Sequence, residues 1–157
     1  MTTRVMLAAG LLAATFSGCA AFKAESARAE VVQTRMAAHV YAAPLGEVWP
    51  EVEAHYGSRV AESEEHTLYT QWTTGQGGSG RSMSRLRVRG TEGQGGTAVV
   101  VTNQGQLRGD SVVSDQGRNH HEELAILRAL DPERAAEIDA EAEQAATDAT
   151  AEPAAKD

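Results

Sequence analysis

The densest group of side chains able to bind a metal or move a proton is His120, His121, Glu122 and Glu123. If this segment is helical, residues three apart share one face, so His120 and Glu123 would point the same way. A closed zinc site needs about four ligands, and the sequence has no paired cysteines and no second histidine cluster to complete one. Glutamates in a first helical turn also have a simpler explanation, since they interact favourably with the helix dipole. We therefore expect neither a metal nor a cofactor.

Residue sets typical of catalysis do not stand out elsewhere in the chain. There is no Ser, His and Asp combination with a supporting motif, no phosphate-binding glycine loop and no pair of carboxylates in an acid–base context. The glycine-rich stretches at 75–80 and 90–96 lie between alternating segments, which is typical of hairpin loops. We expect a non-enzymatic protein.

Three arginines, Arg85, Arg87 and Arg89, alternate with Leu86 and Val88. Successive side chains of a strand point to opposite faces, so the arginines would form a stripe along one face. Such a stripe suits an acidic protein partner, lipid phosphate or peptidoglycan carboxylates. Alternatively, it is a solvated face that glutamates on a neighbouring strand neutralise. We favour the second interpretation and keep the stripe as a candidate interaction surface.

The aromatic residues Trp49, Trp72 and Tyr69 are candidates for a ligand groove. Large aromatic side chains at helix and strand spacing are more often part of the core. We favour the core interpretation and keep the groove as an alternative hypothesis.

Cys19 is the one cysteine of the sequence, and it follows an apolar run. Arg4 precedes the mainly apolar residues 5–16, and the small residues Ser17 and Gly18 come immediately before the cysteine. This order of basic, apolar and small residues is that of a secretory signal peptide. A lone cysteine cannot form an internal disulfide, and the run is shorter than the roughly 20 apolar residues that a transmembrane helix needs.

The residues Phe16, Ser17, Gly18 and Cys19 resemble the lipobox that ends a bacterial lipoprotein signal peptide, with phenylalanine where that family usually has leucine. The resemblance implies removal of residues 1–18, acylation of Cys19 (with palmitate among its fatty chains) and attachment to the membrane through the lipids. Several acyl chains give a stable anchor, whereas one gives marginal binding. The next residue is Ala20, not the aspartate that often retains such proteins in the inner membrane. The expected location is therefore the periplasmic side of the outer membrane.

Charge is unevenly distributed over the chain, whose formal net charge is −8. Residues 131–157 contain nine acidic and two basic residues, whereas residues 19–130 contain 13 and 11. The acidity thus belongs to the C-terminal part, and the remainder is nearly neutral. Such a distribution lacks the basic footprint of a nucleic-acid-binding protein.

The first half of the chain predicts a tether, a strand and a helix. Residues 19–30 form the lipidated tether, and residues 31–41 alternate with period two, which predicts a half-buried strand. A helix should follow from Pro44, with Pro50 causing a kink or a later start and Gly57 ending it. Its apolar residues fall on one helical face: Leu45, Val48, Trp49, Val52 and Tyr56.

The second half predicts an antiparallel sheet followed by helix. Strands are expected at 59–61, 67–74, 81–89 and 97–102, joined by glycine-rich turns. Residues 105–118 predict a long loop, in which only Val112 and Val113 could pair briefly as a strand. Asn119 and Glu122 form a capping box that begins a helix, and Asp131 and Pro132 begin another helical segment. Residues 131–157 are expected to be an acidic tail, helical or disordered, which lacks the large apolar residues needed to bury a core.

These elements predict an α+β domain over residues 31–130, in the order β-α-β-β-β-β-α, with both helices on one face of an antiparallel sheet. The Ala43–Pro44 start with Val48, Trp49 and Pro50, the segment from Leu68 to Trp72 and the arginine-rich strand resemble the helix-grip domain of BamC-type lipoproteins, the NlpB/DapX family. That family implies an accessory role in outer-membrane protein assembly without enzymatic activity. It has two grip domains, whereas this chain has room for one.

The start at Ala43 and Pro44 with Val48 and Trp49 also resembles the START-like helix-grip group. That resemblance implies an apolar ligand or lipid held between a long helix and a curved sheet. Two functions are therefore expected as alternatives. The first is an envelope module that docks a protein partner, and the second is a module that binds an apolar small ligand.

Overall fold

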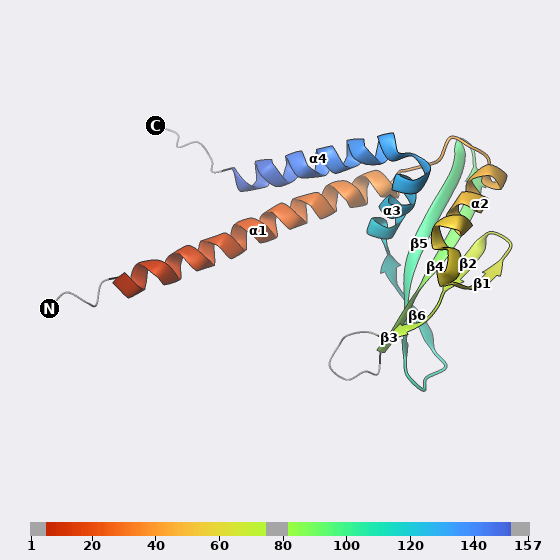
Figure 1. Cartoon of the computed structure of the whole chain (residues 1–157), viewed down its shortest axis with the longest axis horizontal. Coiled ribbons are helices and arrows are strands. Elements are labelled where there is room, and N and C mark those ends of the chain that lie inside the picture. Colours follow the sequence, from red (N-terminus) through yellow and green to blue (C-terminus); the bar gives the residue numbers. More distant parts are fainter. Residues whose placement is uncertain (1–5, 75–81, 152–157) are drawn as a thin grey trace. The chain divides into compact units, whose positions relative to one another are not determined.

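The protein has an α+β fold with an antiparallel sheet, as the sequence predicts (Figure 1). The structure is a computed structural model that describes residues 6–74 and 82–151; for residues 6–18 it describes the backbone only. The helices are α1 (Met6–Ala37), α2 (Leu45–Tyr56), α3 (His120–Leu130) and α4 (Pro132–Thr150). The strands are β1 (Val60–Glu64), β2 (Thr67–Thr70), β3 (Thr73–Thr74), β4 (Ser82–Gly93), β5 (Gly96–Leu107) and β6 (Val113–Arg118). A short 3₁₀ turn, η1 (Gly57–Arg59), follows α2. The chain divides into two compact units, which are residues 36–135 and the residues up to 35 together with those from 136 onward.

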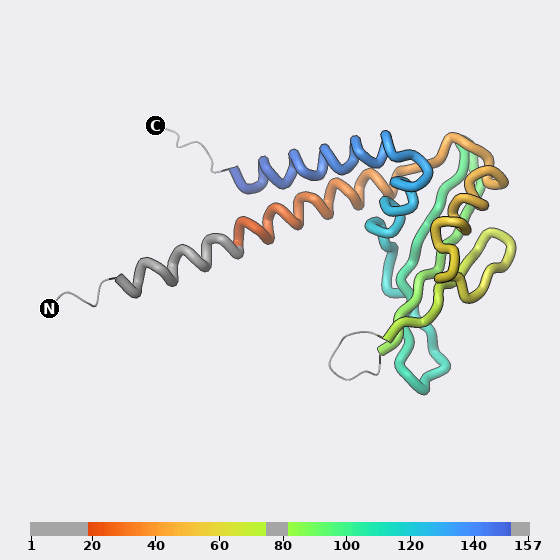
Figure 2. The backbone as a smooth tube through the Cα atoms, viewed as in Figure 1, coloured from red at the N-terminus to blue at the C-terminus, as the bar shows by residue number. Residues whose placement is uncertain are grey.

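The sheet of the first unit has the strand order β1-β2-β4-β5-β6, and β3 pairs with the far end of β4. Strands β4 and β5 pair along their whole length, from Ser82 opposite Leu107 to Gly93 opposite Gly96. Figure 2 shows the chain turning back on itself between these two strands and again between β5 and β6. Because this pairing has no register shift, alternate residues of β4 keep to the same face throughout.

Helix α2 buries the apolar face that its sequence predicts. Its buried residues are Leu45, Val48, Trp49, Val52 and Tyr56. The helix begins directly after Pro44, continues through Pro50 and ends before Gly57, whose φ of 47° suits a glycine. A Cβ atom on Gly90 of β4 would lie 2.6 Å from Leu45 Cδ1 and 2.9 Å from Trp49 Cε3, so glycine lets this helix approach the sheet closely.

Helix α3 packs against β5 and α2, so both helices cover the same side of the sheet. Its N-cap is Asn119, whose side chain accepts a hydrogen bond from the Glu122 N–H at 3.0 Å, as the capping pattern predicts. The Glu122 carboxylate does not return to Asn119 but bonds Arg59 of η1. Leu68, Val88 and Val101 from the covered face of the sheet are fully buried beneath the helices.

The strand expected at 31–41 is wrong, because helix α1 continues to Ala37. Val32 and Met36, the buried residues of this segment before Tyr41, are four apart and fit a helical period as well as a period of two. Ala38 and Val40, which the strand prediction placed on the same apolar face, are exposed. Only Tyr41 of this segment joins the sheet, through a two-residue bridge to Thr97.

The long loop expected at 105–118 is wrong as well. Strand β5 continues to Leu107, and β6 occupies Val113–Arg118. Every residue of β6 is exposed, so no apolar alternation marks it in the sequence. Its backbone pairing with β5 forms the strand, and that pairing is a tertiary interaction that the local pattern does not encode.

The second unit contains most of α1 and α4, which lie side by side (Figure 1). Two arginines of α1 make bidentate ion pairs to α4, Arg28 with Glu143 and Arg35 with Glu141. The expected tail is thus helical to Thr150, and the expected tether is also helical. The tail was expected to lack the large apolar residues that a core needs. In the structure Ile138 and the two alanines Ala142 and Ala146 are buried on α4.

Within the described residues, no helix has both the length and the apolar character needed to span a membrane.

Candidate functional site

Arg85 lies at the centre of an arginine–aromatic cluster, formed by Arg85, Tyr69 and Trp72, on the face of the sheet opposite α2. Its guanidinium carbon is 4.4 Å from the Tyr69 ring centroid and 4.7 Å from that of Trp72. Its Nε donates to Gln104 Oε1 at 3.0 Å, and its Nη1 lies 3.6 Å from a Glu62 carboxylate oxygen. The Arg85 side chain is only 13% exposed, so the cluster is held in place by its own contacts.

Arg87 and Arg89 continue along this open face. Arg87 Nη2 lies 2.8 Å from the Asp115 carboxylate, which also accepts a hydrogen bond from Gln104 Nε2 at 3.0 Å. The hydrogen bond from Gln104, followed by the positive charge of Arg87, lowers the pKa of Asp115. Arg89 is exposed and makes no ion pair within the described part of the chain. Carboxylates of β1 and β6 therefore neutralise two of the three arginines.

Trp49 lies on the other side of the sheet from Tyr69 and Trp72. It is 5% exposed and packs over Gly90. Gly90 is on the same face of β4 as Leu86 and Val88, because alternate residues of a strand share a face, and this face is the one that α2 covers. The aromatic groove suggested by the sequence would need all three residues on one face. The structure brings Tyr69 and Trp72 together around Arg85 and places Trp49 in the core.

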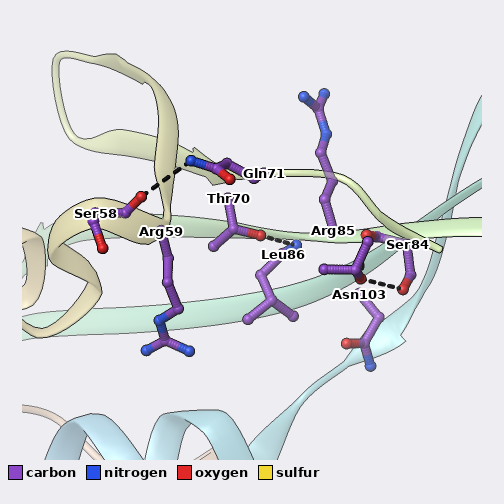
Figure 3. Close-up of a pocket in the computed structure, with 9 residues that line it drawn as sticks. Ser58, Arg59, Thr70, Gln71, Ser84, Arg85, Leu86 and Asn103 are labelled. Carbon is purple, nitrogen blue, oxygen red and sulfur yellow. Dashed lines mark hydrogen bonds between the residues drawn. The ribbon is translucent and has the colours of Figure 1, made fainter. Parts of the chain in front are cut away.

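A pocket of about 390 Å³ lies where the sheet is interrupted between β2 and β3 (Figure 3). Strand β2 ends at Thr70, and the Thr70 hydroxyl accepts the Leu86 N–H at 2.9 Å in place of a backbone carbonyl. Gln71 turns aside, with its N–H donating to the Arg59 carbonyl and its side chain to the Ser58 carbonyl. The pocket is lined by Ser58, Arg59, Thr70, Gln71, Thr73, Ser84, Arg85, Leu86 and Asn103.

Two arginines contribute to this pocket, but their charges are engaged elsewhere. Arg59 lies over the Tyr56 ring at 4.7 Å and bonds Glu122 at 3.1 Å. The Arg85 side chain extends away from the side on which Arg59, Leu86 and Asn103 lie (Figure 3). Its guanidinium belongs to the arginine–aromatic cluster on the open face. The pocket therefore combines the hydroxyl and amide side chains of serine, threonine, asparagine and glutamine residues with a largely apolar lining surface that includes Leu86.

Glu123 forms a buried polar hub under α3. It is 1% exposed and accepts hydrogen bonds from the Val101 N–H at 2.9 Å and Arg118 Nε at 2.7 Å. Its second oxygen lies 3.1 Å from His120 Nδ1, so this pair does share a helical face. Arg118 reaches on to the Met36 carbonyl at 3.0 Å. These contacts fasten α3 to the sheet and leave the carboxylate committed to structure.

No group of three or more His, Cys, Asp or Glu side chains within residues 6–74 and 82–151 is arranged to hold a metal ion. His121 is exposed and Glu122 is directed to Arg59, so the four residues of this sequence cluster do not converge.

The pocket residues were not identified in the sequence. Arg59, Gln71 and Asn103 come from three separate elements, and none belongs to a motif. The one signal that could have indicated the site is the Thr-Gln-Trp-Thr run at 70–73, where polar residues interrupt a strand pattern.

Cys19 is exposed and lies within α1. The helix continues from Cys19 to Ala37. Comparisons of the chain with protein-family models, with curated proteins and with solved structures find no match.

Proposed function

We propose that this protein is a lipid-anchored, non-enzymatic module of the bacterial cell envelope that docks a protein partner. In this proposal Cys19 carries the lipids and anchors the chain at the periplasmic side of the outer membrane. The anchor is supported by the basic, apolar and small-residue order before Cys19. The accessory role in outer-membrane protein assembly follows from the resemblance to BamC-type domains.

The observation that carries the docking proposal is the arginine–aromatic cluster on the open face of the sheet. Tryptophan, tyrosine and arginine are the residue types that contribute most to protein interfaces. Here Tyr69 and Trp72 are half-buried around a guanidinium that is already held by Gln104 and Glu62. A rigid aromatic surface loses little conformational entropy when a partner covers it.

The arginines also indicate the chemistry of that partner. Arg85 and Arg87 have internal carboxylate partners, which leaves Arg89 as the exposed cation at this end of the stripe. A partner would therefore cover the aromatic rings with apolar side chains and place a carboxylate near Arg89. Opposite charges at the edge of an interface chiefly orient the two proteins and speed their association.

The alternative function, an apolar ligand held between helix and sheet, has less support. Trp49 is packed against the sheet in the core, and neither Trp49 nor Trp72 lines the pocket between η1 and the sheet. A START-like site would need a large apolar cavity beneath α2, where Leu68, Val88 and Val101 are fully buried.

The anchor is tested with Cys19→Ala. We expect this variant to lose incorporation of a clickable fatty acid and to leave the membrane fraction, because the acylated sulfur is absent. Ser17→Ala is the matched control, since it keeps a small residue before the cleavage position. Unchanged labelling of Cys19→Ala would refute the anchor.

The docking surface is tested by replacing Trp72 with alanine in the full chain. Wild-type and variant proteins are cross-linked in cells, purified in detergent and compared by quantitative mass spectrometry. We expect Trp72→Ala to lose a defined set of envelope proteins by about tenfold or more, as expected for a central aromatic contact. Phe22→Ala is the control, because Phe22 is 74% exposed but lies on α1. Equal recovery from all three proteins would contradict docking at this face.

A further inference from the structure

We propose that the open groove between α1 and α4 docks a second copy of this chain, so that the α1 helices of the two copies pack antiparallel to each other. The groove belongs to the helical unit and shares no residue with the arginine–aromatic cluster on the sheet. The inference depends neither on the proposed docking partner nor on acylation of Cys19.

The groove lies where α1 and α4 run side by side (Figure 1) and has a volume of about 410 Å³. Its lining is mainly apolar, with Ala27, Val31 and Thr34 on α1 and Ala145 on α4. In a pair of helices each covers only one face of the other, whereas in larger bundles every helix packs on at least two sides. Because all residues that line the groove belong to α1 and α4, it is a second apolar face of this helix pair.

The α1 side of the groove is part of a heptad pattern. Ala20, Ala24, Ala27, Val31 and Thr34 are separated alternately by four and three residues, which is the spacing of a coiled-coil seam. Ala24, Ala27 and Val31 are half-buried, whereas Ala20 and Thr34 are exposed. These five positions form a seam along α1 that another helix can still reach.

Charged residues flank the seam on both sides. Arg28 and Arg35 follow Ala27 and Thr34 directly, and both arginines pair with glutamates of α4. The two arginines therefore mark the side of the seam that faces α4, and their charges are neutralised within the chain.

Lys23 and Glu30 lie on the other side of the seam, because each precedes a seam residue by one position. Both side chains are exposed, and within the described residues neither forms an ion pair. The two residues are about 10 Å apart along the helix axis. Ion pairs within a helix join residues three or four apart, so Lys23 and Glu30 do not suit each other in one chain.

An antiparallel second copy brings these two charges together. When Ala24 lies opposite Ala27 of the second copy, Ala27 also lies opposite Ala24, as two-fold symmetry requires. In this register Lys23 lies beside Glu30 of the second copy and Glu30 beside Lys23, so two ion pairs flank a centre of alanines. The small alanine side chains permit a distance of about 8 Å between the helix axes.

The same charges disfavour a parallel pair. In that orientation Lys23 would lie beside Arg28 of the second copy, and like charges at an interface oppose association. A helix from another protein would need an acidic and a basic residue at the matching spacing. A second copy supplies both, and we therefore infer that it is the occupant of the groove.

The first test is the mass of the full chain in detergent, measured by sedimentation equilibrium over a range of protein concentrations. We expect the wild type to dimerise with a dissociation constant on the order of 100 μM or below. Lys23→Glu should weaken the dimer by about five- to tenfold, because both ion pairs become repulsive. The double variant Lys23→Glu, Glu30→Lys should restore the dissociation constant to within about twofold of the wild type, since the exchanged charges match again.

The seam is tested with Ala27→Glu, which places a charge where the second copy would pack. We expect dimerisation to weaken by at least about tenfold. Ser26→Glu is the matched control, because it adds the same charge at an exposed position outside the seam, and it should dimerise like the wild type. If Ala27→Glu disturbs the α1–α4 pair, the charge exchange at the exposed residues Lys23 and Glu30 decides the question.

The orientation is tested by oxidising a mixture of chains that carry Cys19→Ala and either Ala20→Cys or Val31→Cys. In the antiparallel register Ala20 lies opposite Val31 of the second copy, so the disulfide between the two different chains should dominate. Identical positions would be about 16 Å apart along the helix axis, which is beyond the reach of a disulfide. Disulfides between identical chains alone would overturn the proposal. A wild type that stays monomeric at about 1 mM, or a double variant that dimerises no better than Lys23→Glu, would also overturn it.

Discussion

The two faces of the sheet have opposite characters, although the same strands form them. On the covered face, Leu68, Val88 and Val101 are fully buried under α2 and α3. On the open face, Tyr69, Arg85 and Trp72 form a polar and aromatic surface that belongs to no apolar core. The alternation of side chains along each strand generates this difference without any change of backbone.

The comparison separates residues that hold the fold from residues that are available for binding. Burial beneath the helices should make a covered-face side chain costly to remove. Contacts on the open face are partly solvated and screened, so their removal should cost little stability while altering any docking function. The predictions below test this separation.

The largest contrast is expected between the two tryptophans. Trp49→Ala should lower the free energy of unfolding by about 3–5 kcal/mol, because it empties a packed site in the core. Trp72→Ala should cost about 1 kcal/mol or less, mainly the loss of its cation–π contact with Arg85. Urea unfolding followed by circular dichroism measures both. Similar costs for the two variants would remove the distinction between the faces.

The next contrast is between adjacent glutamates of α3. Glu123→Ala should cost about 3–5 kcal/mol, since it leaves Arg118 and the Val101 N–H without their buried acceptor. Glu122→Ala, its neighbour, removes a partly exposed pair with Arg59 and should cost about 1 kcal/mol or less. Chemical denaturation of both proteins tests this. If the two changes cost the same, Glu123 is not the fastening point of α3.

A smaller effect is expected at Gly90, where the covered face meets α2. Gly90→Ala should destabilise the protein by about 1–3 kcal/mol, because the added methyl group would overlap Leu45 and Trp49. Gly46→Ala is the matched control in α2, where a Cβ atom meets nothing within 4 Å. That change should be neutral or stabilising by up to about 1 kcal/mol. A neutral Gly90→Ala in thermal unfolding would show that the helix can move away from the sheet.

The smallest effect is a pH dependence of stability, which we expect from His39 and not from Asp115 of the open face. Burial, and then the charge of Arg134, lowers the pKa of His39, which stacks edge-on against Tyr41. Because the unfolded chain protonates His39 at a higher pH than the folded protein does, the contribution of His39 to stability is fully present above about pH 6.5. This contribution falls as the pH drops below that value. His39→Phe should reduce the loss of stability between about pH 7 and 5.

Asp115 on the open face provides the comparison for that measurement. Because the pKa of Asp115 is lowered, its contribution to the free energy of unfolding is present above about pH 4, the pKa of an aspartate in the unfolded chain. The contribution is lost at lower pH. Asp115→Asn should therefore leave the stability change between about pH 7 and 5 as it is in the wild type. Denaturation curves at several pH values measure the free energy of unfolding of both variants. The prediction is contradicted if this free energy becomes independent of pH in Asp115→Asn and not in His39→Phe.

Several elements could be predicted because their signals are local. The apolar spacing of α2, the Asn119 cap and the turn before β5 each arise within a few residues of sequence. That turn is shorter than the predicted stretch at 90–96, because residues 90–93 pair with β5 as part of β4. The arginine stripe also followed from strand alternation, and its neutralisation by carboxylates was the favoured interpretation. The partners could not be identified, because Glu62 and Asp115 lie on β1 and β6, which do not neighbour β4 in the sheet.

The errors occurred where a short pattern fits two structures or none. Val32 and Met36 suit a helix and a strand equally, and the helix forms. Strand β6 has no apolar alternation and exists through its pairing with β5. The pocket escaped prediction for a related reason, since Arg59, Gln71 and Asn103 converge only when three elements pack.

The sequence by itself determined the α+β class, the amphipathic face of α2 and the main antiparallel hairpin. These properties depend on composition and short-range periodicity, which a linear chain already contains. Tertiary structure alone decided that Trp49 and Trp72 lie on opposite faces, that Arg85 contacts the rings of both Tyr69 and Trp72, and that a pocket opens where β2 leaves β4. Each of these depends on which strands pair and in what register, and pairing joins residues that no local pattern relates.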